Sequence, residues 1–275
     1  MSSSLTATQL SAPAKDRLHW LASFVLLVLF GWVLTREFTG FRVAGTVDGP
    51  LQTLLFVAAA SSLIAHARQL QWQYVLSAAA ICGGLGSVAF LTSENAGIPL
   101  GPLVFGPAAG AQLTSKLPWT VPCLWIVVVF NSRGVARLML RPWRKLKTYG
   151  FWLIGLTSTL AMLFDLSMDP FLARLNHYWI WQPTKFPLTW AGAPLINFPG
   201  WALVTLFILA FATPLLIKKQ PGQKHTADYH PLLVWMGGVL FFALAEGQHG
   251  LWAAVALNAV VIVTVLIPAI RGGRW

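Results

Sequence analysis

Long apolar runs alternate with short polar segments along the whole chain. Eight of these runs meet or approach the roughly 20 residues that a membrane-spanning helix needs. The fourth run is short and carries Pro118 and Pro122 near its start, and the last two are separated only by Gly247 to His249. The runs cover approximately residues 19–35, 49–66, 72–92, 117–132, 150–167, 195–217, 231–246 and 250–270.

This pattern predicts an all-α protein, a polytopic transmembrane helical bundle of about eight spans, with short non-helical or re-entrant segments on the non-cytoplasmic side. Residues 19–270 would form a single transmembrane domain between cytoplasmic tails at 1–18 and 271–275. No clear cleavage site follows the first run, so we expect it to remain as an uncleaved span. The composition agrees, because 56% of the residues are hydrophobic and only 10% are charged, against about 25% charged in soluble proteins.

The net charge of +11 would suggest nucleic-acid binding in a soluble protein, but its distribution indicates a membrane orientation instead. When the loops are assigned alternately to two sides, most Lys and Arg residues fall on one side, which the positive-inside rule makes cytoplasmic. We therefore predict a multi-pass protein of a bacterial inner (cytoplasmic) membrane, with both termini cytoplasmic, lipid contacts and no nucleic-acid partner. The larger group is Lys15, Arg17, Arg68, Arg133, Arg137, Arg141, Arg144, Lys145, Lys147, Lys218, Lys219, Lys224, Arg271 and Arg274, and the smaller is Arg36, Arg42, Lys116, Arg174 and Lys185.

Acidic residues show the opposite bias, since most of them lie at or near the non-cytoplasmic ends of the spans. The two that have Arg36 or Arg42 nearby are explained by simple tolerance of acids on that side. The other four adjoin spans directly, where an acid is costly and a function is the default explanation. The six are Glu37, Asp48, Glu94, Asp165, Asp169 and Glu246.

Asp165 and Asp169 are four residues apart, so on a continuing helix they share one face, one turn from each other. Two carboxyl groups this close tend to share a proton, which could provide a proton donor at neutral pH. The alternative is a helix end stopped by Pro170, with two solvated acids. The two residues open the segment 165–201, which is too polar to be a span and contains five prolines that prevent a long helix. We expect this segment to form the lid and part of the wall of a site.

Four of the 14 Trp residues lie in that segment. Interfacial belts explain most tryptophans of a membrane protein. Those interleaved with the acids could instead face a cationic intermediate, because indole faces attract positive charge. The four are Trp179, Trp181, Trp190 and Trp201.

The sequence lacks the residues that several other kinds of enzyme chemistry require. The six His residues are scattered, without the close spacing of di-iron sites, and no glycine-rich phosphate loop or nucleophile elbow is present. Cys82 and Cys123 lie inside apolar runs and are expected to be buried thiols. The Asp-x-x-x-Asp pattern is similar to a metal-diphosphate motif of membrane prenyltransferases, but those enzymes need two acidic clusters to hold magnesium, and this chain has one.

Three segments resemble a membrane-integral family of carotenoid biosynthesis, whose known members are carotenoid 1,2-hydratases acting on γ-carotene or bacterioruberin precursors. The segments are SENAGIPLGPLVFG from Ser93, FDLSMDP from Phe164 and GAPLINFPGW from Gly192. The resemblance runs from about Glu94 to Pro214. The chain departs from the family pattern after Gly106, where a tyrosine is expected and Pro107 to Gly110 stand instead.

The resemblance implies addition of water across the terminal C1=C2 double bond of an acyclic carotenoid, without a metal or organic cofactor. Protonating such an alkene requires a strong acid kept protonated by burial. We assign Asp165 or Asp169 as that general acid and Glu94 as the base that orients water. We expect the substrate, a long apolar polyene, to be bound by Asn95, Trp179, Trp181, Asn197, Trp201 and Glu246. Contact with other enzymes of carotenoid biosynthesis is a further expectation.

Two other readings remain open. The first is an intramembrane prenyltransferase or cyclase acting on similar isoprenoid substrates, which in the former case would depend on a divalent metal. The second is a non-catalytic lipid or carotenoid transporter or assembly subunit, in which the acids would be proton relays or helix-pairing contacts.

Overall fold

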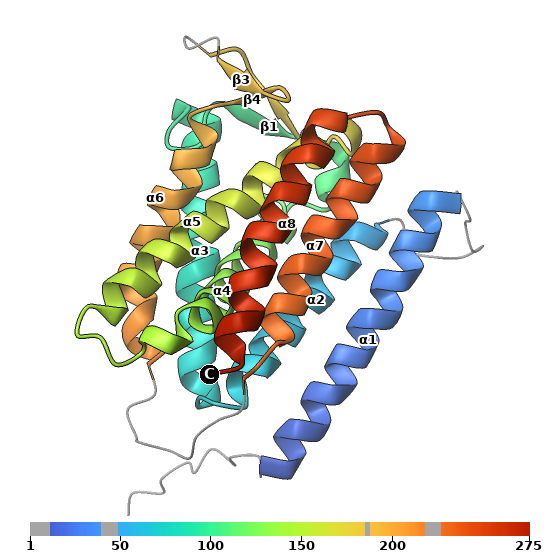
Figure 1. Cartoon of the computed structure of the whole chain (residues 1–275). Helices are drawn as coiled ribbons and strands as arrows, with labels where there is room; N and C mark the ends of the chain where they lie inside the picture. Colours follow the sequence, from blue (N-terminus) through green and yellow to red (C-terminus); the bar gives the residue numbers. More distant parts are fainter. Residues whose placement is uncertain (1–11, 40–48, 185–187, 218–226) are drawn as a thin grey trace, which may run out of the picture.

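The protein is a bundle of eight long helices, seen in a computed structural model that describes residues 12–39, 49–184, 188–217 and 227–275 (Figure 1). Each helix is long and apolar enough to cross a membrane, so the predicted fold class and span number are confirmed. The helices are α1 (Ala12–Thr39), α2 (Pro50–Ala67), α3 (Trp72–Ala96), α4 (Thr120–Met139), α5 (Tyr149–Asp169), α6 (Asn197–Ala212), α7 (His230–Gln248) and α8 (Trp252–Gly273).

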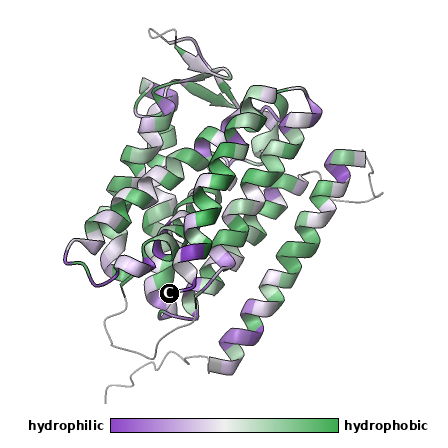
Figure 2. Cartoon of the chain, viewed as in Figure 1, coloured by the Kyte–Doolittle hydropathy of each residue, from purple (hydrophilic) through white to green (hydrophobic). Residues whose placement is uncertain are grey.

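The helices alternate in direction, so α1 begins and α8 ends at the same end of the bundle (Figure 1). The other end carries all four short strands, and we call it the strand end. Most of α4 is buried among its neighbours, whereas α1 lies at the edge of the bundle and is mostly exposed. The outward faces of the helices are apolar, as expected for surfaces that meet lipid (Figure 2).

The element boundaries differ most from the sequence prediction at α1, which begins seven residues before the predicted start and ends four residues after the predicted end, and at α4. Helix α4 begins after Pro118 and continues to Met139, seven residues beyond the predicted end. The expectation that Arg133 lies in a loop is therefore wrong: its side chain is buried in the helix and donates a 3.0 Å hydrogen bond from Nη2 to the Leu216 carbonyl. That bond explains how a charged residue is accommodated within an otherwise apolar span.

The strand end is built from two small antiparallel pairs and one widened helical turn. Strand β1 (Leu103–Phe105) pairs with β2 (Trp179–Trp181), and β3 (Thr189–Trp190) pairs with β4 (Ala193–Pro194). Beyond Asp169 the chain continues as the π-helix η3 (Pro170–Leu175). Pro170 has no N–H to donate to the preceding turn, and π-helical turns of this kind are frequent at functional sites.

The two cysteines lie in the apolar runs as predicted. Cys82 is buried, Cys123 is partly buried, and both are free thiols. The charged residues Arg42, Asp48, Lys185, Lys218, Lys219 and Lys224 lie outside the described residues.

Candidate active site

The first acid of the pair, Asp165, lies inside the bundle on the last turns of α5. Its side chain is fully buried, and its Oδ2 accepts a 2.6 Å hydrogen bond from Nδ2 of Asn197, the first residue of α6. The other oxygen, Oδ1, is also buried and has no hydrogen-bond partner among the residues that the structure describes. A buried polar atom without a partner is costly, so this oxygen is a candidate for contact with a reactant.

The second acid, Asp169, is held by two indole groups. Its Oδ1 accepts hydrogen bonds from Nε1 of Trp179 at 2.9 Å and of Trp181 at 3.1 Å. Both tryptophans belong to β2, where residues two apart point to the same face. Pairing of β2 with β1 fixes that face over the end of α5. Within the part of the chain that the structure describes, every hydrogen-bond partner of the two acids is uncharged.

An aromatic cluster lies beside the acids. Trp201 stacks on Trp125 with ring centroids 4.0 Å apart and an angle of 21° between the planes. The Phe90 ring contacts Trp201 at 6.1 Å and Trp179 at 5.5 Å between centroids. The cluster therefore joins α3, α4, α6 and β2, and one face of the Trp201 indole is already covered by Trp125.

A third buried carboxyl, that of Glu246, comes from a different helix. Its Oε2 accepts a 2.7 Å hydrogen bond from Nδ2 of Asn258, while Oε1 is buried without a hydrogen-bond partner in the described part of the chain. The pair connects α7 to α8. Phe171, in the η3 segment that follows Asp169, packs against Phe241 and Phe242 of α7. Glu246 therefore lies in the same half of the bundle as the aspartates, although it is not hydrogen-bonded to them.

Glu94 and Asn95 lie in the last turns of α3, and Glu94 is one helical turn beyond Phe90 of the aromatic cluster. Glu94 is partly buried, and neither residue is hydrogen-bonded to Asp165 or Asp169. Asn95 is exposed, accepts a 2.6 Å bond from Lys116 and donates one of 2.7 Å to the Leu91 carbonyl. Among the predicted site residues, the structure thus brings together Asp165, Asp169, Trp179, Trp181, Asn197 and Trp201.

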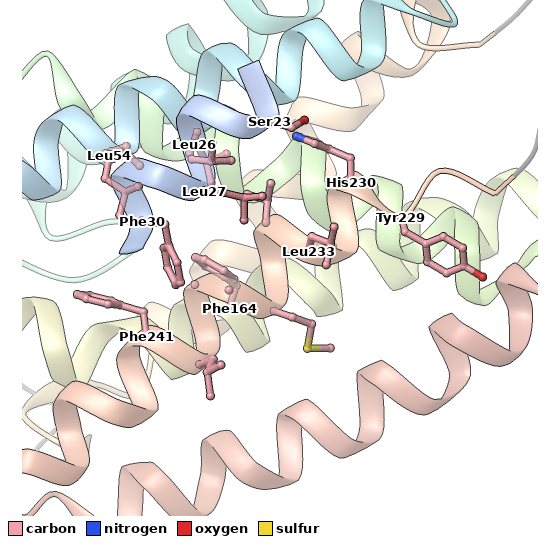
Figure 3. Close-up of a pocket in the computed structure, with 18 of the residues that line it drawn as sticks. Ser23, Leu26, Leu27, Phe30, Leu54, Phe164, Tyr229, His230, Leu233 and Phe241 are labelled. Carbon is pink, nitrogen blue, oxygen red and sulfur yellow. The ribbon is translucent and has the colours of Figure 1, made fainter. Parts of the chain in front are cut away.

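A large cavity of about 1120 Å³ lies between α1, α2, α4, α5 and α7. Phe30, Phe164 and Phe241 line it toward the strand end, and Ser23 and His230 line it farther along (Figure 3). Phe164 and Met168, each one residue before an aspartate, form part of its wall. Asp165 and Asp169 themselves do not line the cavity, because their side chains turn toward α6 and β2. The cavity wall therefore includes the neighbours of both acids in the sequence, and the carboxyl groups themselves face away from it.

Tyr178 is a site residue that the sequence did not reveal. Its ring lines the cavity next to Trp179, and its hydroxyl donates a 2.5 Å hydrogen bond to Oγ1 of Thr120. Burial raises the pKa of this hydroxyl, so it stays neutral. The ring also packs against Phe105 of β1. The sequence signal that could have indicated Tyr178 is its position directly before Trp179 of β2.

Comparison with known proteins assigns the chain to a protein family. The sequence pattern of the family described as carotenoid biosynthesis protein matches residues 49–265. The chain belongs to this carotenoid biosynthesis family. The match includes both aspartates, their three hydrogen-bond partners and every helix from α2 to α7, while α1 precedes it.

The chain is also similar to a hydratase from an archaeon. The bisanhydrobacterioruberin hydratase of Haloarcula japonica is 30% identical over 161 residues, which is 55% of this chain and 52% of the hydratase. The chain therefore spans about half the length of that relative. No solved structure matches the chain. Family membership and the eight spans together identify a membrane protein of carotenoid biosynthesis.

Proposed function

We propose that the protein is a carotenoid hydratase that adds water to the terminal C1=C2 double bond of an acyclic carotenoid. The observation that carries this proposal is the buried Asp165 and Asp169 pair with only uncharged partners among the described residues. The distant similarity to a carotenoid hydratase supports the same reaction class.

The pair suits acid catalysis for an electrostatic reason. Two negative charges one helical turn apart, away from water and without a neighbouring cation, repel each other strongly. Holding one proton between them removes that repulsion, as in other enzymes that use paired carboxyl groups. Asp169 receives two indole N–H groups and is the better stabilised as an anion. Asp165, with its free Oδ1, is then the group that carries the proton to the alkene.

The reaction needs only these groups and one water. Asp165 transfers its proton to C2 of the C1=C2 bond, which leaves a tertiary cation at C1 and an aspartate anion. Water adds to C1, and the proton that it loses returns to the carboxylate, so the product is a tertiary alcohol and the acid is regenerated. The indole of Trp179, Trp181 or Trp201 would stabilise the cation.

We assign Tyr178, in addition to Glu94, to positioning the water. Tyr178 lines the cavity, and its neutral hydroxyl, which donates its hydrogen to Thr120, can still accept a hydrogen bond from water. Glu94 remains the proposed base from the sequence, and its Oε2 is buried with no hydrogen-bond partner among the described residues. The polyene would occupy the large cavity, and Met168, with its flexible side chain, would move aside to admit the reacting end.

The membrane orientation is part of the proposal. The strand end, which holds the acids, would face away from the cytoplasm of a bacterial inner membrane, and both termini would be cytoplasmic. The excess of basic residues at the opposite end supports this orientation.

Pigment analysis after expression in cells that accumulate lycopene tests the proposal. The wild-type chain should yield a carotenoid heavier by one water, and Asp165→Asn and Asp169→Asn should abolish it at unchanged protein abundance. Glu37→Gln, which changes an acid in the last turn of α1, is the matched control and should retain activity. Unchanged pigment with several acyclic substrates would instead favour a transport or assembly role, and inhibition by chelators would favour a metal-dependent prenyltransferase.

A further inference from the structure

The large cavity is open on one side, along a slit between α1 and α7. Helix α1 lies at the edge of the bundle, packs closely along α2 and touches α7 much less (Figure 1). Leu27 of α1 and Leu233 of α7 both line the cavity, yet they are 65% and 67% exposed. Residues that line a cavity and are also exposed mark its mouth. The cavity therefore opens on the outer face of the bundle, which meets lipid.

Two contacts between aromatic rings bound this slit. The rings of His19 and His230 lie 5.0 Å apart between centroids at one end, and those of Phe30 and Phe241 lie 6.4 Å apart at the other. Both pairs have the same offset in the sequence, so α1 and α7 run side by side in one register between the two contacts. At 1.5 Å per residue the slit is roughly 16 Å long.

The middle of the slit has small residues on its α7 side. In this register Gly237 and Gly238 lie opposite Leu26 and Leu27, and all four residues line the cavity. A Cβ atom at Gly237 would meet only the Phe30 ring, at ordinary contact distances of 3.8 and 3.9 Å. A larger side chain at Gly237 would therefore extend into the slit and narrow it.

The cavity is too short to enclose the whole of the proposed substrate. Its lining residues run from His230 to Phe242 on α7, which at 1.5 Å per residue corresponds to roughly 20 Å. An extended forty-carbon polyene is roughly 35 Å long, slightly more than the about 30 Å of a bilayer's hydrocarbon core. When one end of this rod lies beside the acids, close to half of its length must lie outside the cavity.

The chemistry of the two openings favours the slit as the way out for that half. The end of the cavity remote from the acids is narrowed by the contact between His19 and His230. Four charged residues line that end, and an apolar chain passing among them would separate them from water, which is costly. The slit offers apolar side chains that already face lipid. The four charged residues are Lys15, Asp16, Arg68 and Asp228.

We propose that the slit between α1 and α7 is the entrance through which a polyene reaches the cavity from the lipid, and that the bound polyene keeps its unreacted half in the bilayer. The chain passes outward between Leu27 and Leu233, and Gly237 sets the width of the entrance. The identity of the ligand rests on the proposed hydratase function. Recognition is then confined to the half of the molecule inside the cavity.

Reversible closure of the slit tests the entrance. Leu27→Cys and Leu233→Cys are combined in the full-length protein with Cys123→Ala, because Cys123 is the native thiol that is only partly buried. A short bis-methanethiosulfonate joins the two new thiols. Binding of lycopene in lipid nanodiscs is followed by the visible circular dichroism that an achiral polyene acquires in a chiral site. Cross-linking should slow binding by about tenfold or more, because a closed entrance lowers the association rate, and reduction should restore it.

A single substitution tests the same entrance without a reagent. Gly237→Leu should slow the association of lycopene to a similar degree. Gly155→Leu is the matched control and should bind as the wild type does, because Gly155 is exposed on α5 and a Cβ atom there meets nothing within 4 Å. Unchanged binding by the cross-linked protein, or equal association rates for the two leucine variants, overturns the inference. Binding that depends on the slit but gives no hydrated product overturns the hydratase function and leaves the entrance standing.

A shorter polyene tests where the unreacted half lies. Diapolycopene, a thirty-carbon acyclic polyene with the same end groups, is still longer than the cavity. The wild-type protein should hydrate it as fast as lycopene, because the two molecules differ in length only outside the cavity. A strong preference for the longer polyene would show that the protein also recognises the far half, and would overturn this part of the inference.

Discussion

The side-chain amide of Asn197 donates a 2.6 Å hydrogen bond to Oδ2 of Asp165 and so ties the first turn of α6 to the last turns of α5. Both residues are fully buried. The bond fixes the direction of the carboxyl group and leaves Oδ1 as its only free oxygen. Orientation of a reactive group by a neighbour of this kind contributes directly to catalysis.

Asn197→Ala should lower both stability and activity. The substitution leaves a buried carboxyl oxygen without a partner, which costs about 1–3 kcal/mol. The midpoint of thermal unfolding in detergent and the yield of hydrated carotenoid should both fall. Asn95→Ala is the control, because that amide is exposed and its loss should change stability by less than about 0.5 kcal/mol. Equal behaviour of the two variants would remove Asn197 from the site.

Trp179→Phe and Trp181→Phe should each reduce hydration by about tenfold, and the double variant by more. Each substitution removes one N–H donor from Asp169, and tenfold corresponds to about 1.4 kcal/mol, within the range for a hydrogen bond to a charged group. Product formation per unit of protein is the measurement. Trp190→Phe, whose Nε1 has no hydrogen-bond partner among the described residues, should retain activity. A double variant no worse than Trp190→Phe would show that the indole donors are dispensable.

Gly86→Ala should destabilise the protein by about 1–3 kcal/mol. A Cβ atom at Gly86 would overlap the Trp125 ring, which would have to leave its stack with Trp201. Gly84→Ala, two residues away in α3, meets nothing within 4 Å and should be neutral or stabilising by up to about 1 kcal/mol. The comparison is made by thermal unfolding in detergent, and similar values for the two variants would contradict the importance of close packing at Gly86.

Glu246→Leu and Asn258→Leu should each cost about 1–3 kcal/mol, because each leaves a buried polar partner unsatisfied. The double variant should recover much of this loss, since neither side chain is then left without the other. A double-mutant cycle on unfolding free energies should give a coupling of about 0.5–3 kcal/mol. Strict additivity of the two single effects would mean that the 2.7 Å bond between the residues contributes nothing.

Much of the fold followed from the apolar runs, because a helix in lipid must satisfy its backbone internally and needs a minimum length. The eight spans are examples of this constraint. The error at Arg133 has a physical reason as well. The predicted span was ended at Arg133 because that residue is charged. The sequence pattern does not show that the Leu216 carbonyl, far along the chain, accepts a hydrogen bond from its guanidinium.

The site was predictable where the signal was local. The spacing of Asp165 and Asp169, at the end of a span and before Pro170, indicated a shared face and a special environment. Asn258 and Trp125 gave no such signal, because each lies inside an apolar run and its importance depends on a partner from another helix. Asn95 shows the reverse case, since a polar residue beside an acid was expected in the site and instead bonds Lys116 on the surface.

The stacked indoles of Trp125 and Trp201 have an optical consequence. Two identical chromophores held 4.0 Å apart at a fixed angle share their excited states, so the folded protein should carry a pair of bands of opposite sign in its ultraviolet circular dichroism. Those bands would report the integrity of the aromatic cluster beside the acids, in a membrane protein whose helical signal alone would hardly change when the cluster loosens.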